Sequence, residues 1–221
     1  MIIGFVLALI FLVLVSKYIT KRTNIQKLDS AMLKVHKVFG FLLLGVAIVH
    51  NLGVWALRKQ RPKSMFIIGY IMIFLIVIGI LSYLLRAKIG KKWITIHRLT
   101  AILIFTCLVT HVVIGFQSLA SYKQAISETE IENVDFSNLA DGTYIGSYDV
   151  GYVYAKMEVI IRDHKIDNIK ILEHRTEQGE KAECIADSIV AQQSVKVDVI
   201  SSATNSSKVI MKAVENALSG K

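Results

Sequence analysis

The chain has 221 residues, a net charge of +9 and a hydrophobic fraction of 53%. Up to Tyr122 there are 15 Lys and Arg residues and one acidic residue, for a charge of +14, whereas the remainder carries −5. A basic total can indicate a nucleic-acid partner. Here the basic residues form short clusters between long apolar runs, where lipid headgroups are the expected partner. We therefore expect membrane lipid and no nucleic acid, and the two cysteines exclude a disulfide framework.

Four apolar stretches cover approximately residues 2–19, 31–57, 65–85 and 94–119. Each has roughly the ~20 residues that a helix needs to cross the hydrocarbon of a bilayer. The first has no basic residues before it and no Ala-x-Ala cleavage site, which favours a retained helix over a signal peptide. The sequence therefore predicts an all-α four-helix transmembrane bundle over residues 1–122.

The basic residues predict how this bundle is oriented. The first and third connections together carry eleven Lys and Arg residues, and the second connection carries four. The positive-inside rule then places the first and third connections in the cytoplasm. We expect a multi-pass protein of the cell membrane whose C-terminal part is extracytoplasmic.

A different pattern begins at Asp141. Residues 141–148, 152–161 and 166–173 read as strands, and residues 180–193 and 205–218 have helical spacing of their apolar side chains. We predict a small α+β domain over residues 141–221, joined to the bundle by a linker at 123–140.

Four of the six histidines lie in apolar spans. The second and fourth spans each hold two histidines that are 14 residues apart, about 21 Å along a helix and close to one face of it. Because these spans run in the same direction, the four residues form one pair near each side of the membrane: His36 with His97, and His50 with His111.

Neutral imidazole is a good axial ligand for haem iron. A lone histidine in a span can equally be a hydrogen-bond partner between helices or an interfacial residue, but two pairs at one spacing predict two b-type haems. The pattern resembles the membrane cytochromes b, including ferric-reductase-like bundles.

The segment Asp198-Val-Ile-Ser-Ser-Ala-Thr204 precedes the last predicted helix. A turn of small residues at a helix N-terminus favours a phosphate group, because backbone N–H groups and the helix dipole point toward it. Ser206 adds a hydroxyl donor. The alternative is an ordinary polar cap of the helix.

Three segments carry a resemblance to a known family: Asp141-Gly-Thr-Tyr144, Glu173-His-Arg-Thr176 and Asp198 to Thr204. Residues 141–218 resemble the FMN-binding domain of the C subunit of sodium-pumping NADH:quinone oxidoreductase and of the G subunit of the Rnf complex. The resemblance implies an FMN joined to Thr204 as a phosphodiester by an FAD:protein FMN transferase. The cofactor-binding residues predicted in this way are Thr204, Asp198, Ser201, Ser202, Ala203, Ser206, Glu173 and Thr176.

This chain departs from the family pattern at two places. Ser202 stands where glycine is commoner, and Thr176-Glu-Gln-Gly179-Glu replaces Thr-Pro-Gly-x-Gly. His174 is interpreted as an exposed residue at a strand end, with a hydrogen bond to the flavin as the alternative, and His164 as a solvated turn residue. Four tyrosines are candidates either for stacking on the flavin or for packing within the sheet: Tyr144, Tyr148, Tyr152 and Tyr154.

Together these features predict an oxidoreductase or electron-transfer component. We expect a membrane flavocytochrome that takes electrons from a quinol or a redox partner protein, through two bis-His b-type haems, to FMN on Thr204 and on to an extracytoplasmic acceptor. Two alternatives stay open: a relay subunit of a larger redox complex, and a haem-free flavinylated membrane anchor.

Overall fold

A computed structural model describes residues 2–22 and 25–220. The chain divides into two compact units, Met1–Phe116 and Gln117–Lys221. One long helix, α5 (Lys92–Glu128), contributes to both units.

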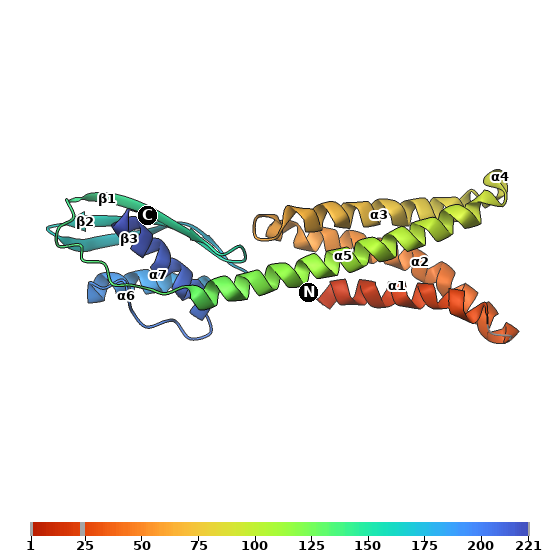
Figure 1. Ribbon diagram of the computed structural model, residues 1–221, viewed down its shortest axis with the longest axis horizontal. Coiled ribbons are helices and arrows are strands. Elements are labelled where there is room, and N and C mark those ends of the chain that lie inside the picture. The colour runs from red at the N-terminus through yellow and green to blue at the C-terminus, as the bar shows by residue number, and fades with distance from the viewer. Residues whose placement is uncertain (1, 23–24, 221) are drawn as a thin grey trace. The chain divides into compact units, whose positions relative to one another are not determined.

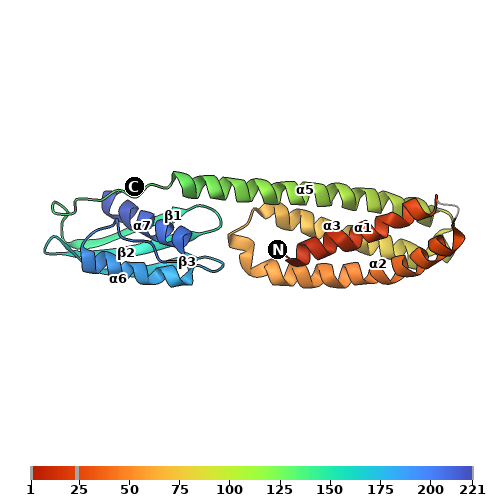
Figure 2. The same ribbon diagram turned by 90° about the horizontal axis from the view of Figure 1, so that it is seen from below.

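The described residues of the first unit form helices joined by short turns, as predicted. Its remaining helices are α1 (Ile2–Thr20), α2 (Gln26–Val54), the short 3-10 helix η1 (Trp55–Lys59), α3 (Lys63–Leu84) and α4 (Arg86–Ile89). Four of the helices in the described residues are long and apolar enough to cross a membrane. They run alongside one another in Figure 2. Leu14 of α1, Leu43 and Ala47 of α2, and Ile76 of α3 are among the buried residues between them.

The outer surface of the first unit is apolar. Leu9, Phe41, Phe74 and Ile102 are each at least half exposed. In water this surface would be a large interaction patch, but lipid chains accept it, and helices satisfy their own backbone groups within the hydrocarbon. The four apolar helices therefore indicate association with a membrane.

The second unit is a three-stranded antiparallel sheet covered on one face by helices (Figure 1). Its elements are β1 (Gly142–Asp149), β2 (Tyr154–Arg162), β3 (Lys165–Arg175), the 3-10 helix η2 (Glu180–Cys184), α6 (Ile185–Gln192) and α7 (Thr204–Ser219). The predicted α+β architecture is confirmed. Alternate residues of the central strand β2 point into the core, and Ala155, Met157, Val159 and Ile161 are fully buried.

Helix α7 packs against β1 and β2 at very short range. Its apolar stripe includes Val209, Ala213 and Val214, all fully buried. Gly146 on β1 faces this helix, and a Cβ atom at Gly146 would lie 2.2 Å from the backbone nitrogen of Ala217. Only glycine permits this approach, so Gly146 allows α7 to pack this closely on the sheet.

A β-bulge changes the phase of β3 near its end. The register pairs Met157 with Ile171 but Ala155 with His174, so Leu172 is the extra residue. A bulge turns the following side chains to the opposite face. Because Ala155 and Met157 face the core, His174 faces the core as well.

The segment that follows the membrane helices is an ordered part of the second unit. Residues up to Glu128 continue α5, and Ile126 is buried in the core that the sheet and α7 form. Beyond the helix, the carboxylate of Asp135 accepts a hydrogen bond from the backbone N–H of Ser137 at 2.9 Å. Hydrogen bonds from the side chain and backbone of Ser137 lower the pKa of Asp135.

We predict that Gly146→Ala strongly destabilises the second unit. The added methyl group must displace the backbone of α7, and we expect a loss of about 3 kcal/mol, at the upper end of overpacking effects. Gly142→Ala on the same strand is the matched control, because its Cβ would meet no atom closer than 3.9 Å. Thermal unfolding together with hydrogen exchange of α7 peptides measures both variants. Equal stability of the two would contradict this packing.

Candidate functional site

The predicted phosphate-binding segment forms a tight loop directly before α7. The N–H of Ala203 donates to the carbonyl oxygen of Ile200 at 3.0 Å, and the N–H of Ile200 donates to the buried hydroxyl of Ser207 at 3.1 Å. The loop is therefore closed by its own backbone and fastened to the first turn of the helix. Thr204 is exposed at the first residue of α7, and Ser201 and Asp198 are also exposed.

Ser202 adopts a left-handed backbone conformation, with φ +65°. Side chains make this conformation unfavourable, and glycine adopts it freely. The geometry therefore favours glycine at this position. Ser202 holds the same turn at some conformational cost.

The N-terminus of α7 lacks a side-chain cap. The N-cap residue is Ala203, which makes no side-chain hydrogen bond to the helix. The first N–H groups of a helix have no partner within the helix. Because no side chain caps them here, these N–H groups can bind an anion. The observed cap therefore differs from the polar cap that was the alternative interpretation of this segment.

A second loop closes on the same helix end. The Thr176 hydroxyl accepts from the N–H of Gly179 at 2.9 Å and lies 3.2 Å from the hydroxyl of buried Ser206. A Cβ atom at Gly179 would lie 1.9 Å from the Ser206 hydroxyl. Thr176 and Ser206, both predicted site residues, are thus brought together beside Thr204. The carboxylate of Glu173, another predicted site residue, lies 3.3 Å from Nε of Arg175.

His174 is buried, which corrects the interpretation of this residue as exposed. Its side chain is 1% exposed, and its Nδ1 atom lies 2.9 Å from a carboxylate oxygen of Glu183. Its Nε2 atom is buried and has no hydrogen-bond partner among the described residues. The bulge at Leu172 accounts for the difference, because simple alternation along β3 would have turned His174 outward. His164, in contrast, is exposed in the turn between β2 and β3.

A ladder of polar contacts joins one stripe of α7 to residues 122–132. Asn205 donates to the Tyr122 hydroxyl at 2.8 Å, and the Lys208 ammonium donates to the carbonyl oxygen of Ile126 at 3.2 Å. Further along, Lys212 contacts the carbonyl oxygen of Glu130 at 3.0 Å and the Glu215 carboxylate at 2.6 Å.

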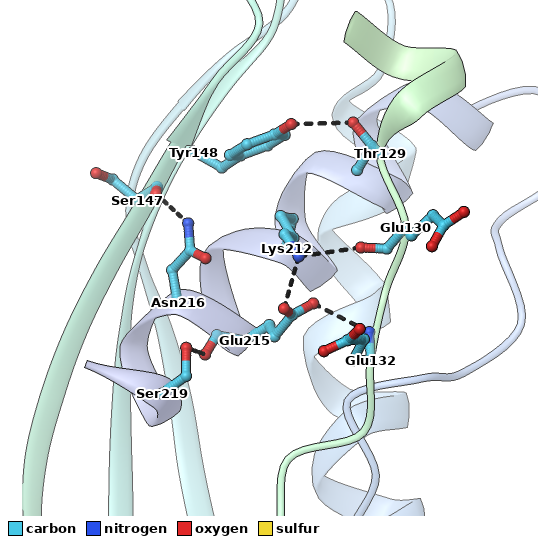
Figure 3. Close-up of polar contacts among 9 residues, drawn as sticks. All are labelled: Thr129, Glu130, Glu132, Ser147, Tyr148, Lys212, Glu215, Asn216 and Ser219. Carbon is cyan, nitrogen blue, oxygen red and sulfur yellow. Dashed lines mark hydrogen bonds and ion pairs between the residues drawn. The ribbon is translucent and has the colours of Figure 1, made fainter. Parts of the chain in front are cut away.

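Glu215 completes this ladder by accepting from the N–H of Glu132 at 3.1 Å (Figure 3). Its side chain is only 3% exposed, so Lys212 and the N–H of Glu132 provide the partners that a buried carboxylate needs. Asn205, Lys208, Lys212 and Glu215 lie three or four residues apart and so share one face of the helix. The helix that begins with Thr204 is thereby fixed to the end of α5.

Two tyrosine rings stack at the start of this ladder. The ring centroids of Tyr122 and Tyr152 are 4.9 Å apart, and the ring planes differ by 15°. Both residues are half-buried. Tyr152 was a candidate from the sequence, but Tyr122 was not, because it lies at the end of an apolar span, where an aromatic residue is expected at the membrane interface.

A cleft of about 520 Å³ borders the other side of the ladder. It is lined by Thr129, Glu130, Ile131, Glu132, Lys196, Val197, Val199, Lys208 and Met211. Four of these side chains are charged, and none is aromatic.

In the first unit, His36 and His97 face each other. Their ring centroids are 5.8 Å apart. The Nδ1 atom of His36 lies 3.1 Å from the carbonyl oxygen of Leu14, and that of His97 lies 3.2 Å from the carbonyl oxygen of Gly79. Since a carbonyl oxygen only accepts, each Nδ1 is the donor, and in the neutral form of the ring the lone pair is then on Nε2.

His50 and His111 line one apolar cavity of about 100 Å³, together with residues that include Gly4 and Gly69. A Cβ atom at Gly4 would lie 3.6 Å from the His50 ring. The structure therefore brings the four half-buried histidines together as two pairs. Among the described residues, no three His, Cys, Asp or Glu side chains gather as a metal site. A haem iron with two imidazole ligands would need only two such side chains from the protein.

The family of FMN-binding domains matches residues 151–219. No curated protein and no solved structure matches the chain. The match covers β2, β3, α6 and α7, with Thr176 and the whole loop from Asp198 to Thr204. The second unit therefore contains an FMN-binding domain, and the predicted flavin cofactor is confirmed at this level.

We predict that Ser202→Gly stabilises the second unit. Glycine relieves a left-handed conformation that costs about 1–2 kcal/mol, and the greater freedom of the unfolded chain offsets about 0.4–1 kcal/mol of that gain. The expected net increase is about 0.5–1 kcal/mol, measured from the denaturation midpoint. Ser201→Gly, which has no such strain to relieve, is expected to lower the midpoint. A lower midpoint for Ser202→Gly would contradict the strain argument.

Proposed function

We propose that the chain is a membrane electron-transfer flavocytochrome, with an FMN covalently bound to Thr204 and two b-type haems held by the histidine pairs. The proposed activity moves electrons from a membrane quinol or a redox partner protein to an extracytoplasmic acceptor. When bound, these groups supply the redox chemistry, which amino-acid side chains do not provide. The chain itself supplies attachment, orientation and shielding.

The position of Thr204 is the observation that carries this proposal. Its side chain is exposed at the start of α7, within an FMN-binding domain and beside backbone N–H groups that no side chain caps. The first turn of α7 can therefore hold a phosphate whose oxygen is esterified to Thr204. Thr176 and Ser206 place two hydroxyl groups beside this position.

Covalent attachment requires an accessible nucleophile rather than a catalytic site in this chain. In the proposed modification, the Thr204 hydroxyl oxygen bonds to the flavin-side phosphorus of FAD. AMP leaves with the second phosphate, and the hydroxyl proton is lost. The exposure of Thr204 and Asp198 leaves this face open to the FAD:protein FMN transferase.

The histidine pairs support the haem part of the proposal. His36 and His97 direct their protonated nitrogens to backbone carbonyl groups, which fixes each ring and leaves Nε2 as a ligand. The ring centroids of this pair are 5.8 Å apart, and these two imidazoles would hold the iron of a haem if one were bound. His50 and His111 offer the same two-imidazole donor set at the second position.

Helix α1 packs along α2, and α2 packs along α3. Helix α5, which carries His97 and His111, meets α3 through side chains, and Nδ1 of His97 lies 3.2 Å from the carbonyl oxygen of Gly79. Axial ligands on facing helices of a four-helix bundle are a common way to hold a haem.

We predict that Thr204→Ala removes the covalent flavin. The flavin fluorescence that remains with the denatured chain on a gel should disappear in this variant, because the ester oxygen is gone. Thr143→Ala, at another exposed threonine of the same unit, should keep it. Fluorescence that persists in Thr204→Ala would show that the flavin is attached elsewhere.

We also predict two haems in each chain, measured as the pyridine haemochrome per protein. His97→Ala and His111→Ala should each lose about one half of the haem, because each removes one ligand of a different pair. His164→Ala, at the exposed turn, should keep both. A wild-type chain with covalent flavin and no haem would instead support the haem-free membrane anchor.

A further inference from the structure

We propose that the stacked pair Tyr122 and Tyr152 is the platform on which the isoalloxazine ring of the flavin stacks, with Tyr122 supplied by the membrane helix α5. This inference rests on the proposed attachment at Thr204 and specifies where the ring system lies. In this proposal, α5 contributes Tyr122 to the flavin site and also carries His97 and His111.

The first observation is the position of Tyr122 relative to Thr204. The Tyr122 hydroxyl accepts from Nδ2 of Asn205, the residue directly after Thr204, at 2.8 Å. A flavin tethered to the Thr204 oxygen through a phosphate and a flexible ribityl chain can reach this position. The hydrogen bond also holds the hydroxyl end of the Tyr122 side chain in place.

The second observation is the chemistry of the surface. The two rings are nearly parallel, at 4.9 Å and 15°, and both are half-buried, which leaves part of the pair exposed. Aromatic rings gain energy from offset stacking on one another. Isoalloxazine is a flat and largely uncharged ring system, and it extends such a stack without burying a charge.

The neighbouring cleft is less suited to the ring. Its lining includes the charged side chains of Glu130, Glu132, Lys196 and Lys208. None of the lining side chains is aromatic, so the cleft offers no ring surface on which the flavin could stack. Lys208 already donates to the carbonyl oxygens of Ile126 and Thr129. The geometry therefore favours the tyrosine pair.

The ladder of polar contacts explains why Tyr122 stays in place. Lys208, Lys212 and Glu215 fasten residues 126–132 to α7 directly after Tyr122. Ile126 adds an apolar anchor in the core. Tyr122 is thus held beside the flavin-bearing helix by groups that lie on both elements, independently of the Tyr152 ring.

Fluorescence of the chain-bound flavin tests this inference, using the full-length protein coexpressed with an FMN transferase and purified in detergent. A tyrosine in contact with a photoexcited flavin quenches its emission. We expect wild-type emission to be weak in the native chain and to rise on denaturation. Tyr122→Leu should raise native emission severalfold at equal flavin content, and Tyr122→Trp, with a larger ring that quenches more strongly, should lower it.

The opposite signs for leucine and tryptophan separate stacking from a general loss of fold. Tyr154→Leu is the matched control, because the Tyr154 ring is covered by the Arg175 guanidinium at 4.1 Å and should leave emission unchanged. Emission that is insensitive to both Tyr122 variants overturns the inference. Emission that responds instead to Val199→Ala, in the wall of the cleft, also overturns it.

The covalent flavin content of denatured wild-type chain distinguishes the two levels of failure. Covalent flavin with no response at Tyr122 overturns the platform and leaves the proposed function standing. Absence of covalent flavin from the coexpressed wild-type chain overturns the proposed function, and the platform with it.

Discussion

The second unit depends most on the ion pair and the hydrogen bond that the buried carboxylate of Glu215 makes. It sits on the flavin-domain helix α7, it is almost completely buried, and both of its oxygens are paired: one with Lys212 and one with the backbone N–H of Glu132. Removal of one partner from a buried ion pair is strongly destabilising, by about 3–5 kcal/mol, because a charge stays behind without compensation. The contact therefore fixes the position of the residues after α5 along α7.

The folded unit that contains the flavin domain extends beyond the residues that the family matches. The family match begins at residue 151, but the folded unit begins at Gln117, within α5. Tyr122 and Ile126 of that helix contribute to the unit through a hydrogen bond and through the apolar core. The end of a membrane helix is thus a structural element of the flavin domain, and residues 129–132 are fastened to α7 rather than left as a free tether.

The sequence was sufficient for the architecture and for the main motif. Long apolar runs predict the four long apolar helices because they differ sharply from the rest of the chain, and the alternation in β2 predicts a strand with one buried face. The small residues before Thr204 predict a turn into a helix, and α7 begins there. The spacing of 14 residues also anticipates that the histidines meet as pairs, and the His36 and His97 rings do face each other.

Other features of the site depend on contacts between distant segments and could not be read from local patterns. The burial of His174 follows from one extra residue, Leu172, which shifts the phase of β3. Tyr122 lies beside the start of α7 and contacts Asn205, which is 83 positions further along the chain. The ladder on α7 is visible in the sequence merely as a polar stripe, which is typical of a solvated helix face.

Thr204 as the point of attachment is the central claim, and mass spectrometry of the intact full-length chain, followed by fragmentation of its peptides, tests it most directly. The account predicts a single added flavin phosphate, located on Thr204 in the peptide that begins the last helix. An unmodified chain after coexpression with a transferase, or a flavin located on any other residue, would contradict it.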